Sequence, residues 1–404
     1  MEDKVDRGGQ IAVVGGGPAG LACALLMAGA GASIDLFAPA AAGRDSRTSA
    51  LMRGSVEILR AIGVWDELKP RAAPLQRLRL VDATGRLVRA PEVTFDAAEL
   101  GRGPFGYNIH NVDLTDAMTR RLAAFPTLRA HAQAVSAVAP LADRVRLTSG
   151  DGGRFEAALV AAADGRDSQC REAAGISCLR HDYPQVALAF NVCHALPHDD
   201  VSTEFHTPSG PLTFVPLPGN ISSVVWVVRP EEADRLLALE DDAFCEDLRR
   251  RCYGLLGGFS SPGKRHGFAL SLRTAWRMAQ RRIALVGEAG HVVPPIGAQG
   301  LNLGLRDGAT LAEIAVDALR AGKDPGSEEC QAAYAQARRA DIAGRSAAID
   351  LLNRSVLSPF LPAQAMRGAG LFLLSRLAPL RHAAMRAGLA APVLEPRVMR
   401  GEPL

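Results

Sequence analysis

Residues 11–37 of this chain read IAVVGGGPAGLACALLMAGAGASIDLF. The first four residues form an apolar run with the length of a buried parallel strand. A glycine-rich turn follows, and then a stretch from Leu21 to Ala30 that is rich in the helix formers Ala, Leu and Met. Residues Ala32 to Phe37 predict a second strand. The segment therefore predicts a βαβ unit, which indicates an α/β fold.

The turn of this unit carries the pattern G-x-G-x-x-G on Gly15, Gly17 and Gly20. Gly15 makes the tight turn, Gly17 lets the backbone approach a pyrophosphate, and Gly20 lets the helix pack closely on the strand. Ala19 lies at the helix N-terminus, where free N–H groups and the helix dipole attract phosphate. We interpret Gly15, Gly17, Ala19 and Gly20 as dinucleotide contacts. The alternative is a glycine-rich turn that binds no ligand.

One residue of the usual dinucleotide site is absent. An acidic residue should end the second strand and bind the ribose hydroxyls, but Ala38 holds that position. Asp35 is close in sequence, and strand alternation directs it elsewhere. We therefore expect Arg44 or backbone groups to hold the adenosine end.

Two later segments repeat the pattern of an apolar strand followed by a glycine and an acid. Residues 158–168 read ALVAAADGRDS and include Asp164 and Gly165. Residues 282–307 read RIALVGEAGHVVPPIGAQGLNLGLRD and include Gly287 and Glu288. The part from Gly297 to Asn302 predicts a loop that leads into a helix, so its backbone N–H groups can stabilise negative charge on a bound ring.

In this order, the three motifs resemble those of the group A FAD-dependent aromatic monooxygenases, over nearly the whole chain. The resemblance implies FAD as cofactor, NADH or NADPH as reductant and O2 as co-substrate. Two positions depart from the family pattern: Glu288 stands where Asp is usual, and Asn111 where Arg or Gln is usual. The cofactor contacts that the resemblance adds are Asp164, Gly165, Gly287, Glu288, Gly297, Gly300, Leu301 and Asn302.

Residues 45–51 (DSRTSAL) and 204–217 (EFHTPSGPLTFVPL) further resemble the ubiquinone-biosynthesis hydroxylase family. In that family the first segment opens a helix beside the flavin, and Arg47 would contact the flavin side chain or pyrophosphate. The substrate pocket implied by the second segment and its surroundings comprises Gln185, Gly210, Pro211, Phe214, Pro216 and Pro295. No nucleophile motif is present, and the candidate catalytic residues are His291, Pro295 and Gln299. His291 has an alternative role in ordering its loop.

The resemblance predicts a p-hydroxybenzoate-hydroxylase-like fold in the α/β class. It consists of a Rossmann-like FAD-binding domain, an antiparallel β-sheet substrate domain and C-terminal helices. The FAD-binding domain would comprise residues 1–80, 110–180 and 281–350. The substrate domain would comprise residues 81–109 and 181–280, and residues 351–404 would form the helical C-terminal region.

Composition and charge limit the classes of partner that the protein is expected to bind. A net charge of +3 gives no electrostatic case for nucleic-acid binding. Seven cysteines without a C-x-x-C pattern predict neither a disulfide framework nor a metal site. Residues 351–404 contain seven arginines against two glutamates, interspersed with apolar residues. This basic amphipathic pattern favours a cytoplasmic protein that associates peripherally with the inner face of a membrane, or a helical pair packed on the flavin domain.

The predicted activity is the hydroxylation of a polyprenylated phenol in ubiquinone biosynthesis, with NAD(P)H and O2. One alternative is a hydroxylase of a small soluble aromatic compound, for which the substrate segments offer no clear cation to bind a carboxylate. Another is a non-catalytic flavoprotein of a biosynthetic complex, which the departures at Ala38, Asn111 and Glu288 keep open.

Overall fold

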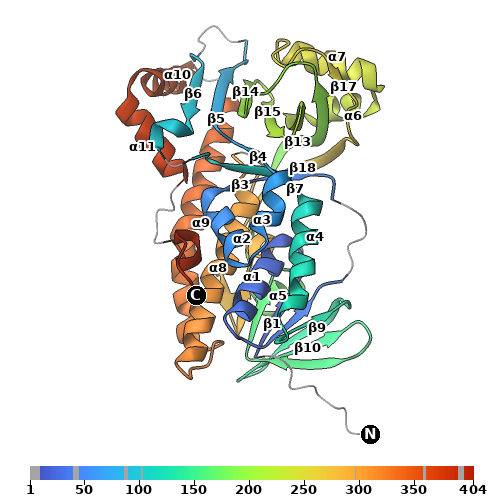
Figure 1. Cartoon of the computed structure of the whole chain (residues 1–404), viewed down its shortest axis with the longest axis vertical. Helices are drawn as coiled ribbons and strands as arrows, with labels where there is room; N and C mark the ends of the chain where they lie inside the picture. The colour runs from blue at the N-terminus through green and yellow to red at the C-terminus, as the bar shows by residue number, and fades with distance from the viewer. Residues whose placement is uncertain are drawn as a thin grey trace.

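The computed structural model describes residues 10–39, 45–85, 90–101, 103–295, 297–357, 361–389 and 395–404. Arg44, which we expected near the adenosine, lies outside these residues. The molecule is elongated, with a parallel sheet in its lower half and a larger sheet across its upper end (Figure 1).

The parallel sheet forms around the βαβ unit. Its strand order is β19-β20-β12-β1-β2-β8, and β1 (Ile11–Val14) pairs in parallel with both β12 (Leu159–Ala162) and β2 (Ile34–Phe37). All residues of these three strands are buried, as expected for the apolar runs of β1 and β12, and the burial includes Asp35 of β2. The remaining strands are β8 (Leu128–His131), β19 (Ala279–Gln280) and β20 (Ile283–Leu285).

Helix α1 (Pro18–Gly29) packs against α8 (Gln299–Arg320) beside this sheet. It begins three residues earlier than its composition predicts, because Pro18 suits the first helical position. A three-stranded meander extends this half of the molecule, with β9 (Val135–Pro140), β10 (Val145–Ser149) and β11 (Arg154–Ala157).

The larger sheet has the order β21-β18-β13-β16-β15-β14-β5-β6, with β17 paired to β13. Neighbouring strands are antiparallel except for the parallel pair β14 and β5. Its strands are β5 (Arg77–Asp82), β6 (Val93–Asp96), β13 (Cys178–His194), β14 (Val201–Thr207), β15 (Gly210–Leu217), β16 (Ile221–Val228), β17 (Phe259–Ser260), β18 (His266–Ala275) and β21 (His291–Val292).

Strand alternation gives this sheet two different faces. On the outer face, Phe190, Phe214 and Trp226 pack in one apolar cluster with Phe244 and other residues of α6 (Pro230–Ala238) and α7 (Asp241–Arg251). On the inner face, Val215 packs with Ala50 and Ala298 of the flavin-side half. The inner face is therefore the one that looks toward the loops predicted to bind a cofactor.

A small sheet connects the two halves through β3 (Thr48–Met52), β7 (Gly106–His110) and β4 (Ala73–Pro74). The expectation that residues 45–51 open a helix is wrong: helix α2 (Arg53–Ala61) begins only after β3. The reason is tertiary, since Ser49 and its neighbours pair with β7 near Ile109. The other helices of this region are α3 (Trp65–Leu68), α4 (Asn111–Arg121) and α5 (Gln169–Ala173).

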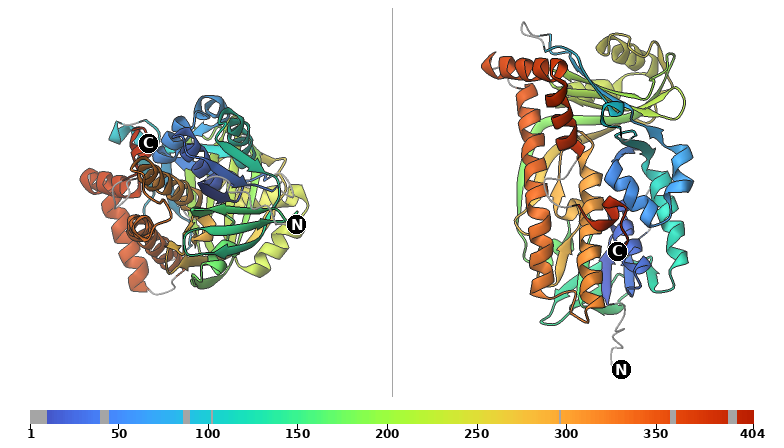
Figure 2. Two further views of the ribbon diagram at one scale, coloured as in Figure 1. Left: turned by 90° about the horizontal axis from the view of Figure 1, so that it is seen from below. Right: turned by 60° about the vertical axis from the view of Figure 1, so that its left-hand side comes forward.

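The C-terminal part forms α9 (Glu328–Leu357), α10 (Leu361–Arg376) and α11 (Ala378–Leu389). Figure 2 shows α9 running alongside α8 toward the larger sheet, with α10 and α11 beside that sheet. Asp350 of α9 accepts a hydrogen bond of 2.7 Å from the hydroxyl of Tyr183 in β13. Across the part of the chain that the structure describes, no helix is both long and apolar enough to cross a membrane. The division into domains at the stated boundaries stays a prediction.

Candidate cofactor and substrate site

The first loop of the site leaves a helix N-terminus open. Gly15 has a φ of +122°, and a Cβ there would lie 2.1 Å from the carbonyl oxygen of Ala163. A Cβ on Gly20 would lie 2.2 Å from the oxygen of Gly15. Among the described residues, a Cβ on Gly17 would meet no atom within 4 Å, and no side chain forms a cap hydrogen bond at α1. The turn therefore packs tightly on its protein side and presents uncapped N–H groups on the other side, which suits a pyrophosphate.

The missing acid at Ala38 is not replaced by Asp35. Asp35 is buried and its carboxylate accepts hydrogen bonds from Arg129, at 2.8 Å from Nη2. His131 lies 2.9 Å from the same carboxylate. These contacts join β2 to β8, so Asp35 stabilises the sheet and faces away from the first loop, as its position in the strand predicts.

The second loop contains Asp164, whose carboxylate organises the loop itself. It accepts hydrogen bonds from the hydroxyl of Ser168 at 2.6 Å and from the N–H of Cys170 at 3.1 Å. Gly165 follows with a φ of +84°, which directs the chain into the polar turn. Contacts of Asp164 and Gly165 with a cofactor stay a prediction.

The third loop places Glu288 at the surface beside the second loop. Its side chain is 54% exposed and lies 3.3 Å from Nε of Arg166. An exposed ion pair of this kind contributes little to stability, roughly 0–1 kcal/mol. The Glu288 carboxylate is therefore accessible for hydrogen bonds from a ligand's hydroxyl groups.

Arg47 contacts one acidic side chain and one aromatic ring. Its Nε is 2.7 Å from Asp45, and its guanidinium lies 5.2 Å from the centre of the Phe268 ring. Asn111 donates a hydrogen bond of 2.9 Å to the same Asp45 carboxylate. Burial would raise the pKa of Asp45, but the hydrogen bonds from Arg47 and Asn111 outweigh it and lower this pKa to about 2. Asn111 therefore acts on Arg47 indirectly, through Asp45.

The loop before α8 turns sharply to present the helix N-terminus. Gly297 has a φ of +64° and Ala298 a φ of +53°, and no side chain among the described residues forms a cap hydrogen bond at this helix. Gly300 is exposed, whereas Leu301 packs against the main core. The helix thus offers free N–H groups at an accessible position.

Asn302 anchors this helix to β3 and α2. Its Oδ1 accepts hydrogen bonds from the N–H of Met52 at 2.8 Å and the hydroxyl of Ser55 at 2.7 Å. Its Nδ2 donates to the carbonyl oxygens of Ala50 at 2.8 Å and Ala298 at 2.6 Å. All hydrogen-bonding capacity of this side chain is used within the protein, so Asn302 shapes the loop and a side-chain contact with a cofactor would require its rearrangement.

A buried ionic network joins α8 to α9, and it was not predicted from the sequence. Asp307 of α8 lies 2.6 Å from His291 Nε2 and accepts hydrogen bonds from Arg338 and from the N–H of Gly287. Burial would raise the pKa of Asp307, but His291 and Arg338 outweigh it and hold this pKa below its ordinary value. His291 is itself buried, which agrees with a role in ordering the loop. Its catalytic role stays a prediction.

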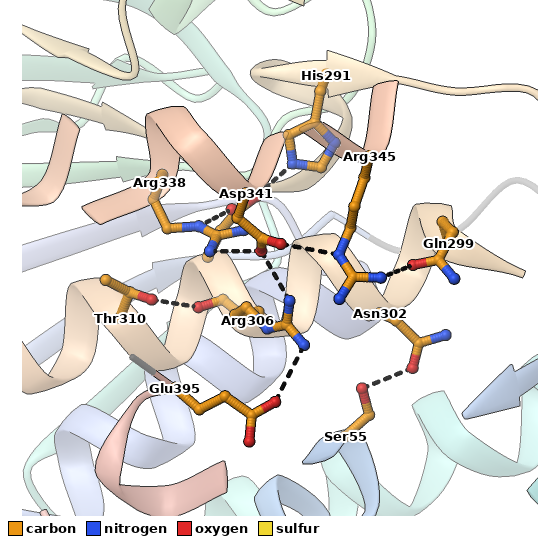
Figure 3. Close-up of polar contacts among 11 residues, drawn as sticks. Ser55, His291, Gln299, Asn302, Arg306, Thr310, Arg338, Asp341, Arg345 and Glu395 are labelled. Carbon is orange, nitrogen blue, oxygen red and sulfur yellow. Dashed lines mark hydrogen bonds and ion pairs between the residues drawn. The ribbon is translucent and has the colours of Figure 1, made fainter. Parts of the chain in front are cut away.

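The network continues along α9 to the loop before α8 (Figure 3). Asp341 accepts hydrogen bonds from Arg306, Arg338 and Arg345 at 2.7 to 2.9 Å. Burial would raise the pKa of Asp341, but Arg306 and Arg338 lower it well below its ordinary value. Arg345 then donates to Gln299 Oε1 at 2.7 Å. The helical spacing of residues 338, 341 and 345 was the one sequence signal for this cluster.

The predicted substrate residues fall into two groups. Gln185 and Gly210 lie together, since a Cβ on Gly210 would be 2.9 Å from Gln185 Nε2. Pro211 alternates with Val215, which places it on the inner face of the sheet. Pro295 is exposed on the loop before α8.

Phe214 and Pro216 have the opposite parity in β15 and belong to the outer side. Phe214 stacks on Phe259 with 5.7 Å between ring centres, inside the cluster covered by α7. The carbonyl oxygen of Pro216 accepts a hydrogen bond of 2.9 Å from Asn108. The structure therefore places Phe214 and Pro216 apart from Pro211, because neighbours in a strand point to opposite faces.

The described residues contain no group of three or more His, Cys, Asp or Glu that could hold a metal ion. An FAD molecule fits the observed features better. Gly17 leaves room for a pyrophosphate, Glu288 is accessible for ribityl hydroxyls, and the α8 N-terminus is uncapped for a ring edge.

Comparison with known proteins decides the family. The profile of the family described as "FAD binding domain" matches residues 9–344. This chain belongs to that family. The cofactor of this family is FAD, and the three loops just described stay its predicted contacts.

Members of the family with full-length similarity include the ubiquinone hydroxylase UbiL of Rhodospirillum rubrum, which is 38% identical over 99% of this chain and 95% of its own. The 3-demethoxyubiquinol 3-hydroxylase of Escherichia coli is 32% identical over 94% of this chain and 98% of its own. Among solved structures, p-nitrophenol 4-monooxygenase PnpA from Pseudomonas putida is similar with a TM-score of 0.78 at 20% identity, over 95% of this chain and 99% of its own. The predicted fold class and the resemblance to flavoprotein monooxygenases are confirmed.

Proposed function

We propose that this protein is an FAD-dependent monooxygenase that hydroxylates the aromatic ring of a prenylated phenol in ubiquinone biosynthesis, using NADH or NADPH and O2. The observation that carries the proposal is the similarity, over almost the full length of both chains, to two proteins named for ubiquinone hydroxylation. The three loops of the FAD site support it, because they occupy neighbouring elements on the side of the molecule that faces the larger sheet.

Each of the three loops would bind a different part of FAD. The N-terminus of α1 at Gly17 would bind the pyrophosphate, Glu288 the ribityl hydroxyls, and the N-terminus of α8 the pyrimidine edge of the flavin. Arg47, held by Asp45, would neutralise charge on the flavin side chain. Bound FAD, once reduced, supplies the activated oxygen for the ring.

The larger sheet would supply the substrate's surroundings. Its inner face near the flavin loops is apolar at Val215, which packs with Ala50 and Ala298. Ser223, the cross-strand neighbour of Val215, accepts a hydrogen bond of 2.7 Å from Thr48, so this part of the face combines an apolar side chain with polar groups that are already paired. Apolar side chains here would exclude water from the reacting groups and suit a substrate with a hydrocarbon tail.

The test begins with the visible spectrum of purified protein. NADH or NADPH is then added anaerobically with and without a prenylated phenol, and the product after O2 admission is analysed by mass spectrometry. We expect faster flavin bleaching with the phenol and a product that has gained one oxygen atom. Failure to bind FAD after reconstitution would overturn the cofactor assignment. Flavin reduction without any hydroxylated product from candidate phenols would favour a non-catalytic flavoprotein.

We also propose that the protein associates peripherally with the inner face of the cytoplasmic membrane through α10 and α11. These helices expose Phe372, Leu373 and Leu380, and Leu377 between them is exposed too, all at least 42% accessible. Arg376 and Arg386 are exposed on the same helices. Apolar groups beside cations suit the interface of a bilayer that contains anionic lipids.

Vesicle flotation tests this second proposal. Full-length protein should float with vesicles that contain anionic phospholipid and less with neutral vesicles. The double variant F372S/L377S should lose roughly thirtyfold in partitioning, since each of the two side chains contributes a free energy of about 1 kcal/mol from its apolar area. The control is L179S, which removes an equally exposed leucine from β13. Folded wild-type protein that never floats would sink the proposal.

A further inference from the structure

Helix α9 has a polar face that is buried against α8. Arg338, Asp341 and Arg345 lie three and four residues apart, with side-chain exposures of 3%, 0% and 13%. Buried ion pairs are weak contributors to stability, because desolvation offsets most of their attraction. Apolar residues could fill a helix interface equally well, so the network calls for an explanation other than stability.

Both ends of the network contact loops of the FAD site. At one end, Asp307 accepts the N–H of Gly287 at 2.9 Å, which fixes the backbone next to Glu288. At the other end, Arg345 Nη1 donates to Gln299 Oε1 at 2.7 Å (Figure 3). Asp341 joins the two ends, because it binds both Arg338 and Arg345.

Gln299 transmits this contact to the turn before α8. It is the first residue of the helix, and its Nε2 donates a hydrogen bond of 3.0 Å to the carbonyl oxygen of Gly297. Between them Ala298 has a φ of +53°, a left-handed conformation that costs a non-glycine residue roughly 1–2 kcal/mol. The Gln299 amide therefore ties the guanidinium of Arg345 to a turn whose backbone is held in an unfavourable conformation.

We propose that Arg345 is a positioning residue: acting through Gln299, it holds the turn at residues 297–299 so that the N–H groups at the α8 N-terminus point at the flavin ring. The proposal rests on the assignment of this helix end to the flavin. N–H donors aimed at the ring favour the reduced flavin, which gains negative charge. The reduction potential of the bound flavin therefore depends on Arg345, a residue that does not touch the flavin.

The test is a double-mutant cycle on the FAD-loaded protein without substrate. R345M and Q299L should each weaken the preference for reduced over oxidised flavin about tenfold, which for a two-electron couple lowers the potential by about 30 mV. Because the two residues act in series, R345M/Q299L should show the same shift as either single variant. R339M is the matched control, since Arg339 is exposed on the same helix. It should retain the wild-type potential.

Two results would overturn the proposal: a wild-type potential in folded R345M, or shifts that add in the double variant. Loss of thermal stability with an unchanged potential would likewise show a purely structural role. If R345M does not fold, Q299L decides alone, because it leaves every charge of the network in place. The potential is measured without a phenol, so a failure of the hydroxylation assay would refute the proposed function and leave this inference standing.

Discussion

The glycines of the first turn are of two kinds. Gly15 and Gly20 lie so close to backbone oxygens that any side chain would displace the chain, whereas Gly17 faces open space. The protein alone therefore explains Gly15 and Gly20, which allow strand and helix to meet. No contact within the described protein explains the glycine at position 17. Its lack of a side chain leaves space for a ligand that approaches the α1 N-terminus.

Gly17→Ala should separate ligand binding from folding. The added methyl meets no protein atom within 4 Å, so the thermal midpoint of the FAD-free protein should stay close to that of wild type. FAD affinity should fall by about tenfold or more, because the methyl occupies the space that the pyrophosphate needs. Fluorescence titration with FAD measures this. Gly344→Ala, also at an open position, is the control and should bind FAD normally. Wild-type affinity in Gly17→Ala would show that the pyrophosphate lies elsewhere.

The side-chain contacts of single residues could be predicted from the sequence only in part. The geometry of the glycine turn and the exposure of Glu288 agree with the predicted FAD contacts, which stay predictions. Asn302 and Asp164 were predicted as cofactor contacts, but their side chains bond within the protein. A sequence motif gives the residue type at a position and does not show which atoms its side chain contacts.

At the scale of elements, the contact between α1 and α8 is unusually close. A Cβ on Gly304 would lie 3.1 Å from Gly287 Cα, and one on Gly308 would lie 3.1 Å from Cys23 Cβ. Two glycines one turn apart thus let α8 approach α1 and the Gly287 loop together. The position of the α8 N-terminus relative to the first loop depends on this contact.

Gly308→Val should separate the two helices. Overpacking a filled interface costs typically 1–3 kcal/mol, and we expect the free energy of unfolding to fall by about that amount. Urea denaturation measures it. Gly344→Val places the same side chain at an open, exposed position of α9, and its unfolding free energy should stay within about 0.5 kcal/mol of wild type. Equal losses in both variants would contradict the close contact.

Elements with strong local patterns were predicted well, including β1, α1 and the strands of residues 204–217. Residues 48–52 were not, because their strand exists only through pairing with β7, almost sixty residues later. The polar face of α9 was missed for a similar reason, since its partners lie on α8. The helical spacing of residues 338, 341 and 345 indicates a shared face of α9, but a segment's own pattern does not show which distant segment it pairs with.

Across the whole molecule, carboxylates with lowered pKa link stability to pH. The pKa of Asp341 lies well below its ordinary value of 3.8 because arginines surround it, and those of Asp45 and Asp307 are lowered too. These three carboxylates therefore bind protons at a higher pH in the unfolded state than in the folded state. The stabilisation is complete above the ordinary pKa and is lost as pH falls through the folded values.

The free energy of unfolding should therefore decrease steeply below about pH 4. In Asp341→Asn the decrease should be shallower, because one of the lowered carboxyl groups is gone. Urea titrations at several acidic pH values give the slopes. Asp317→Asn removes a carboxylate with 52% exposure from α8 and serves as the matched control. Identical slopes for wild type and Asp341→Asn would contradict this role for the network.

Both large sheets are completed by late segments of the chain. β20, which pairs with β12, ends at Leu285, and β21, which pairs with β18, consists of His291 and Val292. A ribosome that adds roughly 5–20 residues per second needs roughly 15–60 seconds to reach them. During that time the nascent chain carries strands whose edges have no partner and can associate with other chains. The yield of folded protein should therefore depend on how well the cell shields the first 285 residues during synthesis.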